Sequence, residues 1–204
     1  MKLKNYYDTG FISSKHLDIG CGFKIKNHYN APKIFGIDIH NNDNDQIENY
    51  KKANLVTEGI PFPDNFFSSV SAYDFIEHIP RQLLIDKKLE FPFINLMNEI
   101  YRVLEPNGLF FALTPFYPSA EAFVDPTHVN FITDSTHKYF THQTDFGSHY
   151  GFNGNFKEKR ILKMHRKYLE KDFNNSFIMH LKWLGIRLKR KYSHLAWELE
   201  AIKN

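Results

Sequence analysis

The sequence predicts an α/β protein built on a doubly wound sheet, and three observations lead to that prediction. Short apolar runs at residues 16–19 and 34–39 each end beside glycines or an acidic residue, as strands that border a ligand site often do. Apolar residues recur with a 3.6-residue period over 93–104, which indicates an amphipathic helix. The run LFFAL at 109–113 is typical of a parallel strand that is buried on both faces.

The other elements of the first half complete this pattern. Weaker apolar runs at 52–56 and 69–73 predict two further strands. The sequence EPNG at 105–108 is a cluster of helix breakers, so we expect the helix to end there. Strands that alternate with crossovers in this way are typical of a doubly wound α/β sheet.

The character of the sequence changes after Thr114. Residues 115–150 are rich in Pro, Phe, Tyr and His, and we expect an irregular segment with one helix over 134–142 that is capped by Thr133. Beyond it, residues 153–164 and 195–202 predict two long strands, the second with alternating faces.

Length and composition favour one globular domain. The 204 residues contain 42% hydrophobic and 24% charged side chains and no linker, so we expect a single domain over 1–204 with a cap or substrate segment at 115–150. The single cysteine, Cys21, excludes a disulfide framework and a cysteine-based zinc site. There is no apolar signal region and no run that approaches the roughly 18 apolar residues of a membrane span, so we expect a cytoplasmic protein.

A basic amphipathic insertion is expected at about 173–192. Twelve Lys or Arg residues and three acidic residues fall between Lys157 and Lys191, whereas the rest of the chain is acidic. Within this region, residues 177–192 present apolar side chains on one helical face and basic side chains on the other. Three roles fit this stretch: a cap packed on the domain, a dimerisation helix, or a helix that contacts the inner membrane surface.

A ligand-binding turn is indicated by Gly20 and Gly22. Two glycines directly after a strand allow a tight turn and a close approach of the backbone to a ligand. Asp38 ends the next strand, where a carboxylate can accept hydrogen bonds from ribose hydroxyls. The third glycine of a dinucleotide fingerprint is absent, since Ile25 occupies its place, so a close pyrophosphate cradle is not expected.

These motifs together resemble the class I S-adenosylmethionine-dependent methyltransferases of the type 11 group. LDIGCG at 17–22 is similar to the first motif of that family, and IDIH at 37–40 to the acidic end of its second strand. Residues 53–79 and 99–115 resemble the stretches around its fourth and fifth strands, in the same order. The resemblance implies a Rossmann-like sheet of about seven strands with the last antiparallel, and S-adenosylmethionine as cofactor.

The resemblance also implies roles for individual residues. Asp18, Gly20 and Gly22 would border the methionine moiety, with Asp18 acting through the loop or the amino group. Asp38 would bind the ribose diol and Ile39 would pack on the adenine. Three more positions are implied at the cofactor or beside it, namely Asn54 and Leu55 at the adenine and Tyr73 near the sulfonium.

The sequence departs from the family pattern at three places. Asn54 stands where the family usually has an aspartate, although its carbonyl oxygen can still accept from the adenine amino group. The connection from Gly22 to Ile34 is near the lower limit for a parallel crossover, so its helix must be very short or absent. About 15 residues precede the first predicted strand, so the N-terminal helices that often cover this fold are not expected, and we expect closure over the cofactor from 115–150 or from 165–190.

The acceptor side of the site is expected in the segment that contains DPTH at 125–128. Methyl transfer to a hydroxyl needs collinear alignment and removal of a proton. We predict His128 as the general base or a substrate ligand, with Asp125 orienting its ring. In the alternative interpretation, His128 only anchors the loop. Further histidines lie nearby at 137, 142 and 149.

No metal site is assigned from the sequence, because the spacing of these histidines matches no ligand pattern. Glu77 and His78 are adjacent and are expected to point in different directions, so one of them would cap or pack the loop. Cys21 is interpreted as a small packed side chain, since no base is implied beside it.

The predicted function is methylation of a small acceptor, most plausibly on a hydroxyl of a sugar or glycan-linked metabolite. The segment at 116–140 resembles one in family members that include some encoded near surface-polysaccharide genes. The place at which base-amine methyltransferases carry an Asn- or Asp-Pro-Pro-aromatic motif holds AYDF at 72–75, so nucleic acid is not an expected partner. Alternatives are methylation of a natural product or an RNA-associated group, and a non-catalytic protein that binds the cofactor or a partner. The oligomeric state is left open.

Overall fold

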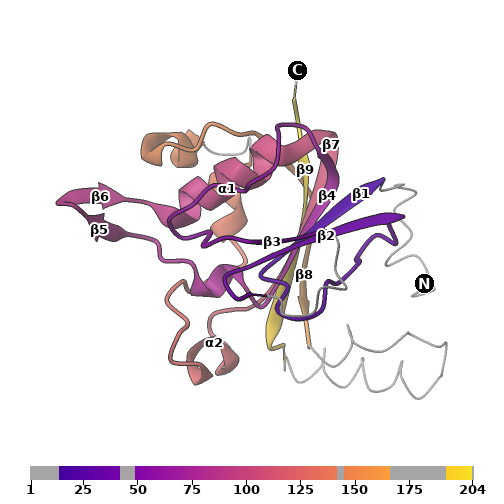
Figure 1. The fold of residues 1–204 in the computed structure, drawn as a ribbon. Helices are drawn as coiled ribbons and strands as arrows, with labels where there is room; N and C mark the ends of the chain where they lie inside the picture. The colour runs from indigo at the N-terminus through magenta and orange to yellow at the C-terminus, as the bar shows by residue number, and fades with distance from the viewer. Residues whose placement is uncertain (1–13, 42–48, 142–144, 166–191, 204) are drawn as a thin grey trace, which may run out of the picture.

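The computed structural model describes residues 14–41, 49–141, 145–165 and 192–203, and its main feature is a seven-stranded mixed sheet (Figure 1). The strands, in the spatial order β3-β2-β1-β4-β7-β9-β8, have these bounds: β1 (Lys15–Ile19), β2 (Lys33–Asp38), β3 (Tyr50–Lys52), β4 (Phe67–Tyr73), β7 (Leu104–Pro115), β8 (Phe156–Met164) and β9 (His194–Ala201). A separate antiparallel hairpin of β5 (Leu83–Ile85) and β6 (Lys88–Glu90) projects from the body.

The sheet topology confirms the expected Rossmann-like fold. β1 pairs in parallel with β2 and β4, β4 pairs in parallel with β7, and β9 is antiparallel to both of its neighbours. The last strand is therefore the antiparallel one, as predicted. The chain order reverses between β1 and β4, so the carboxyl ends of these strands flank the crevice in which ligands bind in such sheets.

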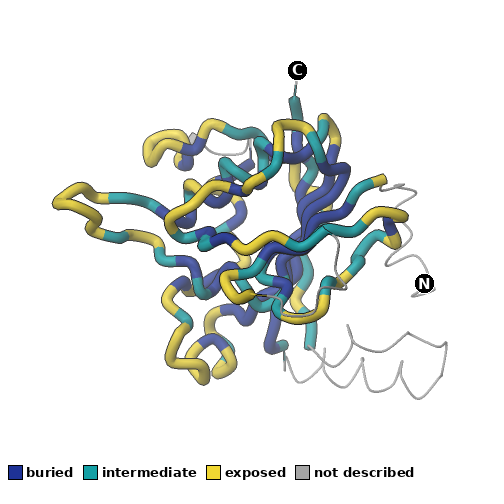
Figure 2. Tube along the Cα trace, viewed as in Figure 1, coloured by how far each residue is buried: buried dark blue, intermediate teal, exposed yellow. Residues whose placement is uncertain are grey.

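One face of the sheet is covered by α1 (Pro92–Val103). Its apolar stripe, which includes Leu96, Met97 and Ile100, is buried in the same core cluster as Phe110 and Trp197 of the sheet. Figure 2 shows the buried parts of the chain gathered along the central strands. Burial of a side chain of this size contributes about 1.5–3 kcal/mol. This packing explains why the helical period predicted from the sequence is found almost unchanged. The shorter helices are α2 (Glu121–Val124) and the 3₁₀ helices η2 (Ile76–His78), η3 (Thr136–Phe140) and η4 (Asp145–Tyr150).

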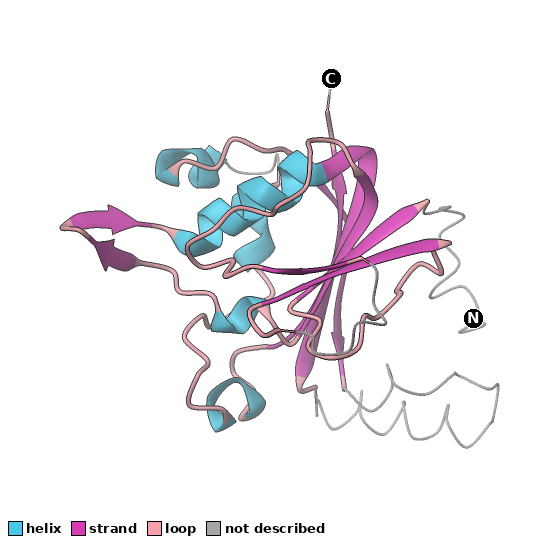
Figure 3. Cartoon of the chain, in the orientation of Figure 1, coloured by secondary structure: helices cyan, strands magenta, loops and turns pink. Residues whose placement is uncertain are grey.

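Among the described residues, the opposite face is covered by a loop and not by a helix. Residues 20–32, all of which the structure describes, contain no helix, which confirms the expected loss of the first crossover helix (Figure 3). The ring of His28 stacks on Phe111 with centroids 3.6 Å apart. The hydroxyl of Tyr29 donates a hydrogen bond to Glu198 on β9 at 3.0 Å. The side chains of this loop therefore cover this face of the sheet, as α1 covers the other face.

Two predicted elements differ from the structure. The third strand ends at Lys52 instead of spanning 52–56, because the Asn54 side chain accepts a hydrogen bond from the backbone N–H of Val56 and starts a turn. The helix expected over 134–142 is the shorter η3, at whose start Thr133 Oγ1 accepts from the N–H of Ser135.

The basic amphipathic stretch at 173–192 lies almost entirely outside the described residues, as does His142. The predictions made for them therefore remain predictions. Within the described ranges, no helix combines the length and apolar character that crossing a membrane requires.

Candidate functional site

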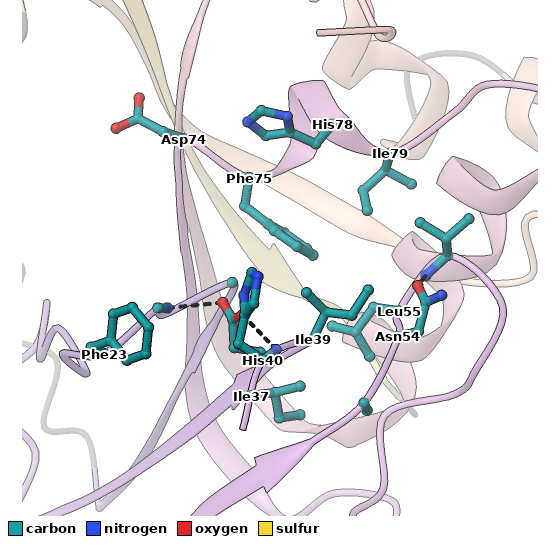
Figure 4. Close-up of a pocket in the computed structure, with 15 residues that line it drawn as sticks. Phe23, Ile37, Ile39, His40, Asn54, Leu55, Asp74, Phe75, His78 and Ile79 are labelled. Atoms are coloured by element: carbon teal, nitrogen blue, oxygen red, sulfur yellow. Dashed lines mark hydrogen bonds and ion pairs between the residues drawn. The ribbon is translucent and has the colours of Figure 1, made fainter. Parts of the chain in front are cut away.

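A cavity of about 480 Å³ opens at the carboxyl ends of β1, β2 and β4 (Figure 4). Its size is within the range of small-molecule sites. Six of the predicted cofactor residues line it: Gly20, Gly22, Asp38, Ile39, Asn54 and Leu55. Three segments of the chain, at 20–22, 38–39 and 54–55, thus meet in one cavity at the switch point of the sheet.

The two glycines of the turn have different tasks. Both adopt left-handed backbone conformations, with φ of 64° at Gly20 and 58° at Gly22. A Cβ on Gly20 would lie 2.1 Å from Cδ2 of Phe75, so the absent side chain makes room for that ring. A Cβ on Gly22 would meet nothing within 4 Å, because it would point into open space. Gly20 therefore serves packing, and Gly22 leaves the backbone exposed toward a ligand.

Asp38 is held at the cavity by three N–H groups. Its Oδ2 accepts from the backbone of Gly22 at 2.9 Å, and its Oδ1 accepts from the backbone and Nδ1 of His40 at 3.1 and 2.8 Å. Burial by itself would raise the pKa of this carboxyl, but the hydrogen bonds outweigh it and the net shift lowers the pKa. The carboxylate is therefore charged at neutral pH and fixed in orientation.

The wall beside Asp38 is apolar. Ile39 lines the cavity although it is half exposed, and Leu55, Ile37 and Ile79 lie across from it (Figure 4). Asn54 lines the same end, with its side-chain oxygen occupied by the turn described above. An apolar slot beside a carboxylate suits a flat heterocycle joined to a diol.

Asp18 and Tyr73 are not among the residues that line the cavity. Asp18 accepts hydrogen bonds from the backbone of Lys26 at 2.8 Å and from the hydroxyl of Ser71 at 2.7 Å, and it therefore ties the glycine-containing loop to the sheet from behind. Burial raises the pKa of Asp18 to about 6. The hydroxyl of Tyr73 bonds to Nδ1 of His28 at 2.6 Å.

Several lining residues were not named as cofactor residues from the sequence. Phe23, His40 and Phe75 surround the glycine turn and the end of β2, and Asp74 and His78 line the far end (Figure 4). Their proximity to the glycine turn and to the end of β4 was the available signal. A positive φ of 49° at Asp74 also marks the sharp turn that follows β4.

The DPTH segment packs against η2, whose His78 lines the far end of this cavity. The backbone carbonyl of Glu77 accepts hydrogen bonds from the N–H groups of Val129 and Asn130, at 3.0 and 2.9 Å, which fixes the loop on η2. Nε2 of His128 then lies 3.9 Å from Oε1 of Glu77, and the rings of His128 and His78 are 4.8 Å apart. Residues 50 positions apart are thus brought together.

Asp125 does not contact His128 in the way that was predicted. Its Oδ1 accepts from the backbone and hydroxyl of Thr127, at 2.8 and 2.6 Å, and Thr127 Oγ1 lies 2.9 Å from Nδ1 of His78. Nδ1 of His128 instead faces the carbonyl of Ala122 at 3.2 Å. Asp125 therefore supports His78, through Thr127.

The other residues considered from the sequence have these surroundings. The buried carboxylate of Glu77 accepts from the hydroxyl of Thr114 at 2.9 Å. His137 is buried and lies 2.7 Å from a carboxylate oxygen of Glu158, whereas His149 is exposed in η4. The pKa of the Cys21 thiol is raised to about 12 by burial, which fits a packed side chain.

The chain is similar to known methyltransferases both in sequence and in structure. The profile of the type 11 methyltransferase domain matches residues 17–112. No curated protein matches the sequence. A solved S-adenosylmethionine-dependent methyltransferase from Archaeoglobus fulgidus superposes with a TM-score of 0.54 at 16% identity, over 97% of this chain and 90% of that one. Another from Mesorhizobium loti gives 0.59 at 12% identity, over 96% and 94%. At these identities the structural likeness shows the shared fold.

Proposed function

Since the methyltransferase domain profile matches residues 17–112, we propose that this chain is a class I S-adenosylmethionine-dependent methyltransferase of the type 11 group and that it methylates a hydroxyl group of a sugar or glycan-linked metabolite. The observation that carries this proposal is a pair of imidazoles: His78 lines the far end of the cavity, and the ring of His128 lies 4.8 Å from that of His78.

The cavity fits the cofactor on three counts. The charged Asp38 stands where a ribose diol can donate to it, Ile39 and Leu55 form an apolar slot for adenine, and the open turn at Gly22 leaves backbone accessible to the methionine part. When bound, S-adenosylmethionine supplies an electrophilic methyl group on a sulfonium and leaves as S-adenosylhomocysteine. The protein must then align the acceptor oxygen with the methyl group and deal with the hydroxyl proton.

The hydrogen bonds around the two imidazoles define their tautomers. Thr127 Oγ1 donates its proton to Asp125, so it must accept from Nδ1–H of His78. The carbonyl of Ala122 can only accept, so Nδ1 of His128 also carries a proton. In the neutral rings both Nε2 atoms are therefore lone-pair donors. An acceptor hydroxyl can give its proton to such a nitrogen, or such a nitrogen can ligate a cation that acidifies the hydroxyl.

Exposed aromatic rings beside the DPTH segment support a sugar-like acceptor. Phe123 and Phe131 stack with centroids 4.8 Å apart, and Tyr117 packs against Phe123 at 6.4 Å. All three rings are more than a third exposed. The apolar C–H faces of a pyranose can pack on such rings while its hydroxyls reach the imidazoles.

The test is a methyl-transfer screen on the purified protein. Labelled S-adenosylmethionine is offered with sugars, nucleotide sugars and glycans, and in parallel with amine and thiol analogues of each acceptor found. We expect label on oxygen, and we expect His128→Ala to slow turnover by about 100-fold with cofactor affinity kept. Transfer to an amine or a thiol only, or full turnover by His128→Ala, would contradict the proposal. His149→Ala, which changes an exposed histidine outside the site, is the matched control.

A further inference from the structure

Glu77, His78 and His128 form a compact set of ligating groups. One potential ligand atom from each lies within 4.8 Å of those of the other two. The separation of 3.9 Å between His128 Nε2 and Glu77 Oε1 is too long for a hydrogen bond. Two metal–ligand bonds of about 2.0–2.2 Å that meet at a tetrahedral angle span about 3.4 Å, so the side chains would draw closer together by about 0.5 Å or more to share one ion.

The surroundings of these groups are those of a metal centre. Histidines that ligate metals usually donate the other ring N–H to a carbonyl, a carboxylate or a similar acceptor, which fixes ring and tautomer. Here Nδ1 of His128 faces the carbonyl of Ala122, and Nδ1 of His78 faces Thr127, which is itself bonded to Asp125. Both Nε2 lone pairs are left for ligation.

We propose that Glu77, His78 and His128 bind a divalent transition-metal ion at the acceptor end of the cavity. Two imidazoles and one carboxylate select ions such as Zn²⁺, Fe²⁺ or Mn²⁺ over Mg²⁺, which prefers an all-oxygen shell. Three protein ligands leave coordination positions open, as in sites where a metal binds a reacting oxygen. The spacing of histidines in the sequence gave no sign of this site, because its members come from two segments 50 residues apart.

The metal would act on the acceptor of the proposed reaction, and this part of the inference rests on the proposed function. An acceptor hydroxyl that binds at an open position has its pKa lowered by the ion, so its proton passes to water. The oxygen then forms the new C–O bond as the C–S bond breaks, and the electron pair of that bond stays on sulfur. His78, which also lines the cofactor cavity, places the ion next to the transferred methyl group.

The experiment measures metal binding without any acceptor. Full-length protein is stripped with a chelator and titrated with Co²⁺, whose visible absorption reports nitrogen and oxygen ligation, and then with Zn²⁺ in competition. We expect one equivalent to bind and Zn²⁺ to displace it. His128→Ala should weaken Co²⁺ binding by about 100-fold or more, and Thr127→Val, which removes only the support of His78, by about 10- to 100-fold.

Controls separate this inference from the proposed function. His149→Ala should bind Co²⁺ as the wild type does, and S-adenosylhomocysteine titration of each variant checks that its cofactor site is folded. Absence of stoichiometric Co²⁺ binding by protein that binds S-adenosylhomocysteine would overturn the metal site and leave the proposed function standing. Equal loss of Co²⁺ binding in His149→Ala would also overturn it. Metal binding with transfer only to amines would uphold the site and contradict the proposed hydroxyl acceptor.

Discussion

Asp38→Ala is the most direct test of the cofactor cavity. Three N–H groups already bind the Asp38 carboxylate, which has about four lone-pair positions, so at least one position remains for a ribose hydroxyl. A hydrogen bond to a charged group contributes about 1.5–3 kcal/mol, and each 1.4 kcal/mol is a factor of ten in affinity. We therefore expect S-adenosylhomocysteine to bind Asp38→Ala about 10- to 150-fold more weakly than the wild type.

The measurement is calorimetric titration with S-adenosylhomocysteine, together with urea unfolding of each variant. Asp134→Ala removes another carboxylate, one that pairs with Lys163 at 2.6 Å on the surface, and should leave cofactor affinity unchanged. Because hydrogen bonds lower the pKa of Asp38, the wild-type affinity should not change between pH 5 and 8 through this group. A folded Asp38→Ala protein that binds within about threefold of the wild type would refute the ribose assignment.

Three further expectations concern the turn and the loop-covered face. Gly20→Ala should lower the free energy of unfolding by at least about 2 kcal/mol in urea denaturation, because the new Cβ meets the Phe75 ring in a left-handed conformation; a wild-type midpoint would disprove this. Tyr73→Phe should lower the free energy of unfolding by about 1 kcal/mol but change the affinity for S-adenosylhomocysteine less than about twofold. A tenfold loss of that affinity would show instead that Tyr73 contacts the cofactor. Burial lowers the pKa of His16 to about 4 and that of His28 to about 3, so below pH 6.5 the unfolded chain binds more protons than the folded protein. The free energy of unfolding should therefore fall as the pH drops from 6.5 toward 4. The raised pKa of Asp18 opposes this fall, and the net loss at pH 5 should be on the order of 3 kcal/mol. Urea midpoints that are equal at pH 7.5 and 5 would contradict it.

The meeting of six proposed cofactor residues in one cavity was predictable because its signals are local. Gly20, Gly22 and Asp38 stand directly at strand ends, and the switch point of a parallel sheet brings such ends together. The apolar residues Ile39 and Leu55 follow in the same segments. No side-chain detail was needed to place these residues in one cavity.

The alternation of side chains along a strand explains why Asp18 and Tyr73 do not line the cavity. On β1, Leu17 and Ile19 belong to the main core, so Asp18 between them must face the other side of the sheet. Tyr73 accordingly packs in the small cluster of that second face, with Phe111. Their positions outside the cavity lining could have been predicted, because successive side chains of a strand point to opposite faces of the sheet.

The arrangement at the proposed acceptor end was not predictable in the same way. The conjunction of Glu77 with His128 depends on two backbone hydrogen bonds from the loop after the DPTH motif to one carbonyl of η2. Backbone groups are the same in every residue, so such contacts leave no pattern in the sequence. His78 and Asp125 were both named from the sequence, but nothing in the sequence indicated that Asp125 supports His78 through Thr127.

The loop that replaces the first crossover helix links the beginning of the fold to its end. Tyr29 and Glu198 are 169 residues apart in the chain, and the same loop contains Gly22 and the backbone N–H that binds Asp18. Chains emerge from the ribosome with the N-terminal part first, so this loop can form its contact with Glu198 only after β9 has been synthesised. Contacts of such long range also slow folding. The glycine turn is thus among the first parts to be synthesised and among the last to be fixed in place. Binding of S-adenosylhomocysteine during synthesis or refolding would therefore report that the final strand has joined the sheet.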